Sequence, residues 1–232
     1  MATPGSNIGD RITDIIGSQY ATIPSLSYKD MINSAFNEVA DMMSEDILLK
    51  YSADPANVTS ASGTSIEDKK LLKVTRIDAN SSGVERECTP LDRTAYAQAK
   101  DSNSIYYATV YSPVYRLDSD NAATTVEIAP ACNSDGQAGK IWTFAYAGNS
   151  TDLTSITYAT LNTTHYMPSN SIRAIVLKSC VNIMQAYISD FIQDEEDSEM
   201  YQMIQNQLQG LKAEFQEEIA RFMDESGRPG SE

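Results

Sequence analysis

The sequence has few of the residues on which catalysis and metal binding usually depend. Its 232 residues include one histidine and three cysteines. Cys88, Cys132 and Cys180 lie 44 and 48 residues apart with no CxxC pair, which fits neither a zinc site nor a disulfide framework. His165 lies in a polar segment with no serine or acid placed to form a dyad, so we expect a surface residue. Nucleotide-binding, metalloprotease and hydrolase motifs are missing. We therefore expect no enzymatic activity, no metal and no cofactor.

Long hydrophobic runs and an excess of positive charge are also missing. The apolar runs are far shorter than the roughly 18 residues of a membrane span, so we expect no membrane contact. The opening MATPGSNIGDR has neither a basic nor an apolar signal region, and we expect assembly in a cytoplasm. The net charge of −15 argues against a grip on nucleic-acid phosphates, which requires clustered lysine and arginine. The negative net charge is compatible with DNA that slides past the protein without binding.

The most informative segment is the last quarter of the chain, residues 171–225, which predicts two helices separated by the acidic residues 194–197. The first helix is apolar on nearly every side and is therefore expected to be buried. The second has one apolar seam at spacings of three and four, made of Met200, Met203, Ile204, Leu208, Leu211, Phe215, Ile219, Phe222 and Met223. Two interpretations of the seam stay open: it docks on a partner protein, or it covers its own domain.

An amphipathic helix is also predicted near the start of the chain, capped by Ser27 and running to about Lys50. Its apolar face should pack against the buried helix at residues 171–192. Its other face carries polar side chains, among them Asn33, Asn37 and Asp41. If these two distant helices pair, everything between them is an insertion.

The middle of the chain changes to the alternating pattern of strands. LLKVTRID and VERECTPL predict a hairpin, and three later runs rich in tyrosine, valine and threonine predict further strands, with a short helix at 93–100. Pro113 splits its run or makes it an edge strand. Residues 52–68 and 149–170 read as a loop and a polar linker. Tyr107, Tyr111 and Tyr115 form a candidate contact face, although packing within the sheet is the commoner use of such tyrosines.

The predicted fold class is therefore α+β. We expect an N-terminal arm at 1–26, a helical bundle made of 27–68 and 149–193, and an inserted small antiparallel β domain at 69–148. A long acidic C-terminal helix and tail occupies 194–232. That last segment has eleven acidic and three basic residues, a net charge of −8, so it is either solvated or meets a basic partner surface.

This order of elements resembles the head-to-tail adaptor (connector) proteins of tailed bacteriophages. SYKDMINSAFNEVADMM is similar to their opening helix, SIYYATVYSPVYRLDSDNAATTVEIAPACNSDG to the strands of their insertion, and MPSNSIRAIVLKSCVNIMQAYISD to their returning core helix. The resemblance extends in pattern over residues 27–225. One departure is the long, continuous final helix, where a flexible tail is also common in the family.

The resemblance implies a virion structural protein of the neck, in a ring of typically twelve copies beneath the portal and around the DNA channel. The expected partners are the portal protein, docked through residues 198–232, then tail or neck proteins and other copies of the chain. Genomic DNA would pass through the lumen without specific binding. Two alternatives stay open: another neck, tail-completion or baseplate protein, or a carbohydrate- or surface-binding module that uses the tyrosine-rich sheet.

Overall fold

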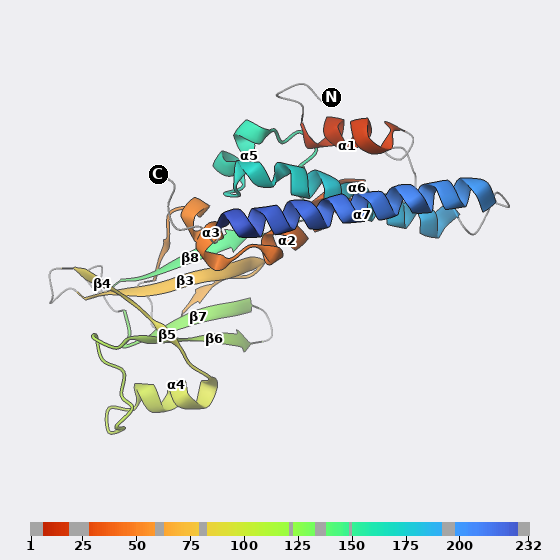
Figure 1. Ribbon diagram of the computed structural model, residues 1–232. Coiled ribbons are helices and arrows are strands. Elements are labelled where there is room, and N and C mark those ends of the chain that lie inside the picture. Colours follow the sequence, from red (N-terminus) through yellow and green to blue (C-terminus); the bar gives the residue numbers. More distant parts are fainter. Residues whose placement is uncertain are drawn as a thin grey trace. The chain divides into compact units, whose positions relative to one another are not determined.

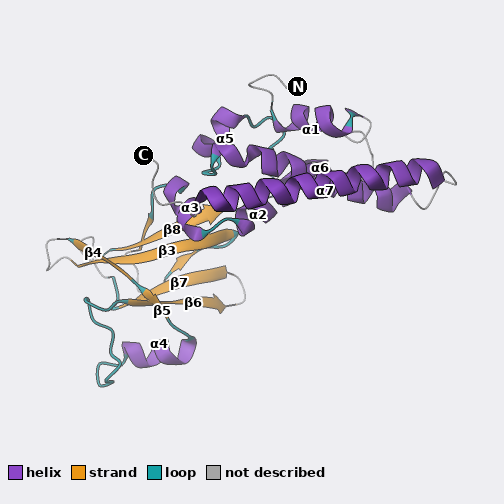
Figure 2. Ribbon diagram, viewed as in Figure 1, coloured by secondary structure: helices purple, strands orange, loops and turns teal. Residues whose placement is uncertain are grey.

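The computed structural model has a mixed α+β fold (Figures 1 and 2). It describes residues 7–18, 28–58, 63–78, 83–120, 123–132, 138–148, 150–191 and 198–226. Seven α-helices and two four-stranded sheets lie in these ranges. The chain divides into two units: unit 1 comprises Met1–Tyr51 and Tyr146–Glu232, and unit 2 comprises Ser52–Ala145. Unit 2 contains the strands expected between residues 69 and 148 and begins at Ser52.

Unit 1 is built around the helix α6 (Ile172–Phe191), against which α1 (Ile8–Ile16), α2 (Tyr28–Met42) and α7 (Ser198–Ser226) pack. Ile175, Cys180 and Met184 of α6 are fully buried. The predicted burial of this helix and its pairing with α2 are both confirmed. A helix that is apolar on nearly every side must be covered over most of its surface, which explains why three other helices meet on it.

The N-terminal segment contributes to the same core. Asn7 caps α1 by accepting a hydrogen bond from the backbone N–H of Asp10 at 2.8 Å, and Gly17 ends the helix with a φ of 93°. Ile8, Ile12 and Ile16 of α1 are buried, whereas Ile15 is exposed. Residues 7–18 of the expected arm are therefore packed in unit 1. Residues 1–6 and 19–27, including the predicted cap Ser27, lie outside the described residues.

Two predictions for the helical segments are wrong in detail. The helix expected to continue to Lys50 ends at Met42, and α3 (Glu45–Tyr51) follows. A new helix starts after the break because the carbonyl of Ser44 accepts a hydrogen bond from the N–H of Leu48. Acidic residues in the first turn of α3 favour this start, since they lie at the positive end of the helix. The polar linker 149–170 contains α5 (Tyr158–Thr164) and a short 3₁₀ turn, η4 (Ser169–Ser171), before α6.

Two asparagines on the polar face of α2 bind backbone. The Asn33 side chain is buried and donates to the carbonyl oxygens of Gly148 and Thr151, both at 3.0 Å. One turn later, the Asn37 amide both donates to and accepts from the backbone of Ala147. Because residues four apart share a helix face, these two amides hold the segment 147–151, where the chain has just re-entered unit 1.

A charged cluster joins α2 to α6. Lys178 lies 2.7 Å from the Glu38 carboxylate, which also accepts hydrogen bonds from Ser34 and Asn182. Burial alone would raise the pKa of Glu38, but these donors outweigh it and hold the pKa below its usual value. Lys178 also lies over the ring of Phe215 in α7, 5.8 Å from its centroid. One lysine therefore links three helices.

Unit 2 contains two sheets packed face to face. Sheet A has the order β1 (Ala56–Val58), β8 (Gly139–Ala145), β3 (Lys69–Asp78), β4 (Val84–Glu87), and is antiparallel throughout. Sheet B has the order β2 (Thr64–Ser65), β7 (Ala123–Ala129), β6 (Val114–Asp120), β5 (Thr89–Pro90). The β3–β4 hairpin confirms the sequence prediction. Two expectations are wrong: β5 runs parallel to β6, and the expected loop 52–68 supplies β1 and β2.

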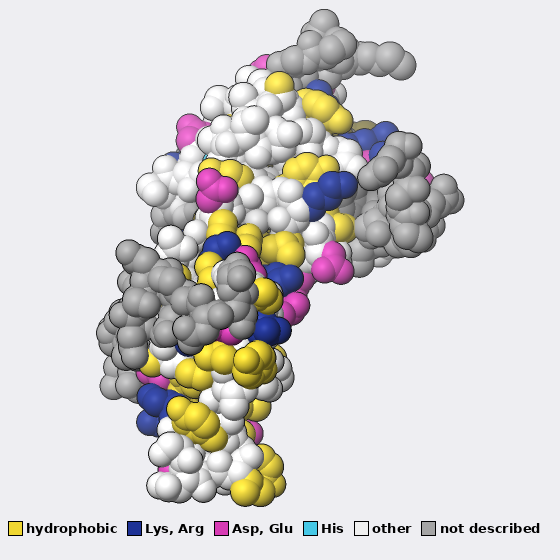
Figure 3. All heavy atoms as spheres, turned by 90° about the vertical axis from the view of Figure 1, so that its left-hand side faces the viewer, with side chains coloured by type: hydrophobic (Ala, Val, Ile, Leu, Met, Phe, Trp, Pro, Cys, Tyr) yellow, Lys and Arg dark blue, Asp and Glu magenta, His cyan; other side chains and the backbone are white. Residues whose placement is uncertain are grey.

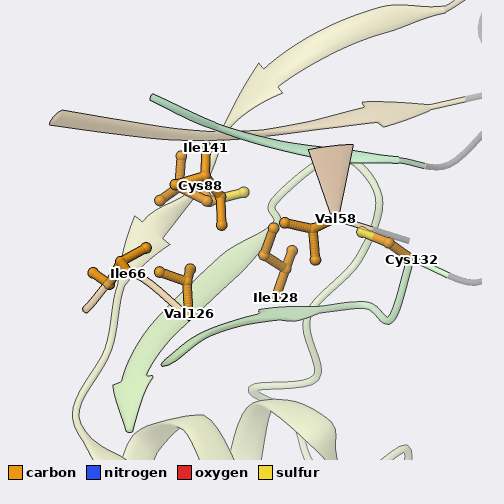
Figure 4. Close-up of a cluster of buried hydrophobic side chains, with 8 residues drawn as sticks. Val58, Ile66, Cys88, Val126, Ile128, Cys132 and Ile141 are labelled. Carbon is orange, nitrogen blue, oxygen red and sulfur yellow. The ribbon is translucent and has the colours of Figure 1, made fainter. Parts of the chain in front are cut away.

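The core of unit 2 lies between the two sheets (Figure 4). Val58 and Ile141 of sheet A point toward Val126 and Ile128 of sheet B. Against the outer face of sheet B packs α4 (Arg93–Lys100), the short helix predicted there, which Asp92 caps by accepting from the N–H of Ala95. The result is three layers within this unit: sheet A, sheet B and α4 (Figure 1).

A charged cluster lies on the face of sheet B that packs against α4. Arg116 of β6 donates to Glu127, its cross-strand neighbour, and to Asp118, two residues along the same strand. Its guanidinium also lies over the ring of Tyr96 in α4, 5.1 Å from the centroid. These contacts attach α4 firmly to the sheet, because a half-buried arginine with two carboxylate partners is expensive to separate from them.

We expect Leu208→Ala to lower the free energy of unfolding of the full chain by about 2–5 kcal/mol, because Leu208 is buried where α7 packs on α6. The matched control is Met203→Ala on the same helix, whose side chain is 65% exposed and whose loss should cost about 0.5 kcal/mol or less. Denaturant unfolding measures both. Equal effects would contradict the packing of α7 on α6.

We also expect acid to weaken unit 1 through Glu38. Because the folded-state pKa of Glu38 is lowered, its contribution is present above the ordinary carboxyl pKa and is lost as pH falls through the folded-state value. Since Glu38 is partly exposed, that contribution is about 1 kcal/mol or less. Comparing Glu38→Gln with the unmodified chain between pH 7 and pH 3 isolates it. The stability difference between the two proteins should shrink toward low pH, and a constant difference would disprove this role.

Candidate functional site

The predicted docking seam of α7 is largely used inside unit 1. Ile204, Leu208 and Leu211 are buried, and Phe215 and Ile219 are half-buried. Because α7 packs on α6, the middle of the seam fits the second interpretation, in which it covers its own domain. Met200 and Met203, at the start of the helix, are exposed. The side chains of Phe222 and Met223 lie outside the described residues.

One residue of this seam was not identified from the sequence. Glu218 is buried and forms ion pairs with Arg173 of α6 at 3.6 Å and with Arg221 at 2.8 Å. It continues the spacing of three and four from Leu211 through Phe215, so it occupies a seam position with a charged group. This spacing is the feature of the sequence from which Glu218 could have been identified as part of the seam. The pair with Arg173 fixes α7 against α6 at this end of the contact.

The three predicted tyrosines do not share a face. Tyr115 lies in β6 and packs against the cluster between the two sheets of unit 2. Tyr107 and Tyr111 precede the strand and are exposed. The reason is Pro113, which ends the run as the sequence indicated: β6 begins only at Val114. The two exposed tyrosines therefore belong to a loop rather than to the sheet.

That loop carries the most exposed apolar side chains among the described residues. We call Ile105, Tyr106, Tyr107 and Tyr111 the aromatic loop; the exposed fractions of their side chains are 91%, 67%, 45% and 71%. In Figure 3, hydrophobic side chains gather beside lysine and arginine at the lower end of the view, where α4 and this loop lie. Single exposed apolar residues need no explanation, but four within seven residues make this loop the candidate interaction site of unit 2.

The backbone of the aromatic loop is held in place by hydrogen bonds. The N–H of Ser104 donates to the carbonyl of Asp101 at 2.9 Å, and the N–H of Tyr107 donates to the carbonyl of Ser104 at 3.1 Å. Ala108 is buried beside α4, and its N–H donates to the carbonyl of Ala99 at 2.9 Å. Exposed rings on an ordered backbone lose little entropy on binding, which favours a contact surface.

A cation also supports one of the rings. The guanidinium of Arg86, in the edge strand β4, lies 5.1 Å from the ring centroid of Tyr111. Arg86 is directly opposite Arg76 in the β3–β4 ladder. Like charges in such a pair repel, and the electron-rich face of Tyr111 offsets part of that cost. Tyr111 is thereby fixed in orientation while most of its surface stays open.

The three cysteines and the histidine, the side chains best suited to catalysis or metal binding, are buried or half-buried. Burial raises the pKa of Cys88 and of Cys180 to about 12 and also raises the pKa of Cys132, so all three thiols stay protonated near neutral pH. His165 is half-buried against the ring of Phe36, with centroids 5.9 Å apart, and burial lowers its pKa. The expectation of a surface histidine is therefore wrong. Within the described ranges, no three histidine, cysteine or acidic side chains are grouped to hold a metal ion.

Comparison with protein-family models, with curated proteins and with solved structures finds no match for this chain. In the parts of the chain that the structure describes, no helix combines the length and the apolar character needed to cross a membrane. Functional inference therefore rests on the chain's own surfaces.

We expect Ile105→Ser and Tyr106→Ser to leave the melting temperature within about 2 °C of the unmodified value, because exposed side chains contribute little to the folded core. Tyr115→Ser should lower it clearly, since Tyr115 packs against the buried cluster of unit 2. Differential scanning calorimetry of the three variants makes the comparison. A large loss of stability in either loop variant would mean that the aromatic loop is part of the fold and not a free surface.

Proposed function

We propose that this protein is a structural component of a tailed-phage virion. It forms a ring, of twelve copies, between the portal and the tail. In this proposal the chain is a helical bundle with an inserted β domain, and the ring lines the channel through which the genome passes. No catalytic step is assigned to it.

The observation that carries the proposal is the arrangement of helices and strands along the chain. The segments at both chain ends contribute to one helical unit, while the whole stretch between them is a β unit with its own core. The helical unit is compatible with a ring wall. The β unit, with an exposed and ordered aromatic loop, is compatible with contacts to neighbouring proteins.

The charge distribution is consistent with a DNA channel. Unit 2 has nine basic and twelve acidic residues, a net charge of −3, which leaves −12 of the total −15 on unit 1. An acidic wall repels the phosphate backbone, so DNA can slide past it without being held.

Docking on the portal is assigned to the end of α7 and the residues that follow it. The middle of the seam is occupied by α6, while Met200 and Met203 at its start are exposed. Phe222 and Met223 continue the seam in sequence toward the C-terminus, and the proposal assigns docking to them on that pattern alone.

A second candidate function has one observation in its favour. The exposed tyrosine rings of the aromatic loop could stack on sugars, which would make unit 2 a carbohydrate-binding module. Ile105, the most exposed of the four, speaks against this, because an aliphatic side chain gains more from burial in an apolar protein surface than from contact with hydroxyl groups. Binding to a glycan array would support the carbohydrate module. If the protein instead has another neck, tail-completion or baseplate role, the aromatic loop and α7 would be its contact surfaces as well.

The direct test is mass photometry of the protein mixed with portal rings of the same virus. We expect each portal ring to gain about 305 kDa, which is twelve copies of 25.4 kDa. Phe222→Asp should remove the gain, because it places a charge in the proposed docking segment, whereas Met42→Asp, at an exposed site on α2, should retain it. No gain with folded protein and intact portal would contradict the proposal.

A further inference from the structure

Two arginines of unit 2 have enclosed side-chain N–H groups for which the protein supplies no acceptor. Arg76 in β3 is buried, with 2% of its surface exposed, and Arg86 lies directly opposite it in β4. The Nη1 of Arg76 and the Nε of Arg86 make no hydrogen bond in the part of the chain that the structure describes. A buried donor without an acceptor is costly, and more so when it belongs to a charged group. The pair is therefore a candidate site for a group that accepts hydrogen bonds.

Both side chains reach the same end of sheet B. Arg76 donates from Nε to the carbonyl of Pro130 at 2.9 Å, and Pro130 directly follows β7. The guanidinium of Arg86 lies over the ring of Tyr111, shortly before β6 begins. The first residue of β6 pairs with the last residue of β7, so these two contacts lie close together. Because directly opposite residues of a ladder also have neighbouring side chains, the two guanidinium groups are neighbours at this end of the two sheets.

The acidic residues of these strands do not neutralise the two arginines fully. Glu85 and Glu87 of β4 project from the opposite face of sheet A, where each is already paired with a lysine. On sheet B, the acids of the charged cluster beside α4 are likewise paired, with Arg116. Asp78 shares the face of Arg76 in β3, two residues further along. Two arginines and one aspartate leave a local charge of +1, in a unit whose net charge is −3. An anion fits this local charge.

We propose that Arg76 and Arg86 together bind one oxyanion, a phosphate or a carboxylate group. Oxyanions match the planar fork of a guanidinium, and hydrogen bonds between the two are strong because both partners are charged. The bound charge also removes the repulsion between the two arginines, which the ring of Tyr111 offsets only in part.

Access to the site is from the side of Arg86. The two unpaired nitrogens are enclosed, so a side chain has to rotate before an anion reaches them. Arg86 is half-buried in an edge strand, and the side chain that lies over it, Tyr111, is 71% exposed. Arg76, in contrast, is held by the backbone that follows β7. The site lies within a single copy of unit 2, so it does not depend on the proposed ring.

The side-chain Nε–H resonances of arginine test the site on the full chain, in a proton–nitrogen correlation spectrum. Inorganic phosphate and acetate are each titrated in parallel with sodium chloride at the same ionic strength. We expect the Nε–H resonance of Arg86 to shift along a saturable curve, because that atom gains an acceptor. Arg93, exposed on α4, is the internal control and should shift no more than it does in chloride. Saturation by phosphate alone identifies a phosphate site, and saturation by acetate as well shows that protein carboxylates also fit.

Variants at Arg86 separate binding from general salt effects, with the Nε–H resonance of Arg76 as the reporter. Arg86→Lys keeps the charge but not the fork, and it should weaken binding about tenfold or more. Arg86→Gln should abolish saturation, whereas the matched control Arg93→Gln should bind as the unmodified chain does. Arg76 is left unchanged because it also holds backbone carbonyls.

Two results would overturn the inference. One is a shift of the Arg86 resonance in phosphate and acetate that never saturates and equals the shift in chloride. The other is undiminished saturable binding in Arg86→Lys or in a folded Arg86→Gln. Neither result bears on the ring, whose mass gain on the portal is measured separately.

Discussion

The fold of unit 1 depends on one constraint, which is that α6 is apolar on nearly every side. Apart from a narrow polar stripe that includes Lys178 and Asn182, its surface must be covered by other elements, and α1, α2 and α7 do so from distant parts of the sequence. Charged pairs at the margins, Lys178 with Glu38 and Arg173 with Glu218, fix the positions of the covering helices. The hydrophobic contacts supply most of the stability, and the ion pairs select which faces meet.

This constraint also decides which surfaces are left for partners. Because α6 occupies the middle of the α7 seam, another protein cannot use those positions without displacing the helix. Among the described side chains, exposed apolar surface is then found at the start of α7 and in the aromatic loop of unit 2. In unit 2 the core cluster is buried between the sheets, and α4 covers the outside of sheet B. Neither the sheets nor α4 covers the aromatic loop, whose backbone is held by hydrogen bonds between α4 and β6.

Helical periodicity predicted the type of the long elements, but not their partners. The pattern of α6 is sufficient to predict its burial, since no other environment suits it. The seam of α7 looks the same whether its partner is another protein or α6, so the sequence could not decide between them. The sequence places Asn33 on the polar face of its helix but does not identify its partners, the carbonyls of Gly148 and Thr151, because they are more than a hundred residues away. The strands β1 and β2 are short and polar, and only their pairing with β8 and β7 makes them strands.

The central claim is that the aromatic loop is covered when the protein assembles. Hydroxyl-radical footprinting measures this directly, because tyrosine side chains are oxidised in proportion to their exposure. Footprints of the free protein and of the portal-bound ring should differ at Tyr106 and Tyr111, both exposed in the single chain. Tyr158, exposed on unit 1, is the internal reference. Strong protection at the two sites with Tyr158 unchanged is the predicted result. Unchanged oxidation of both in an intact ring would contradict it.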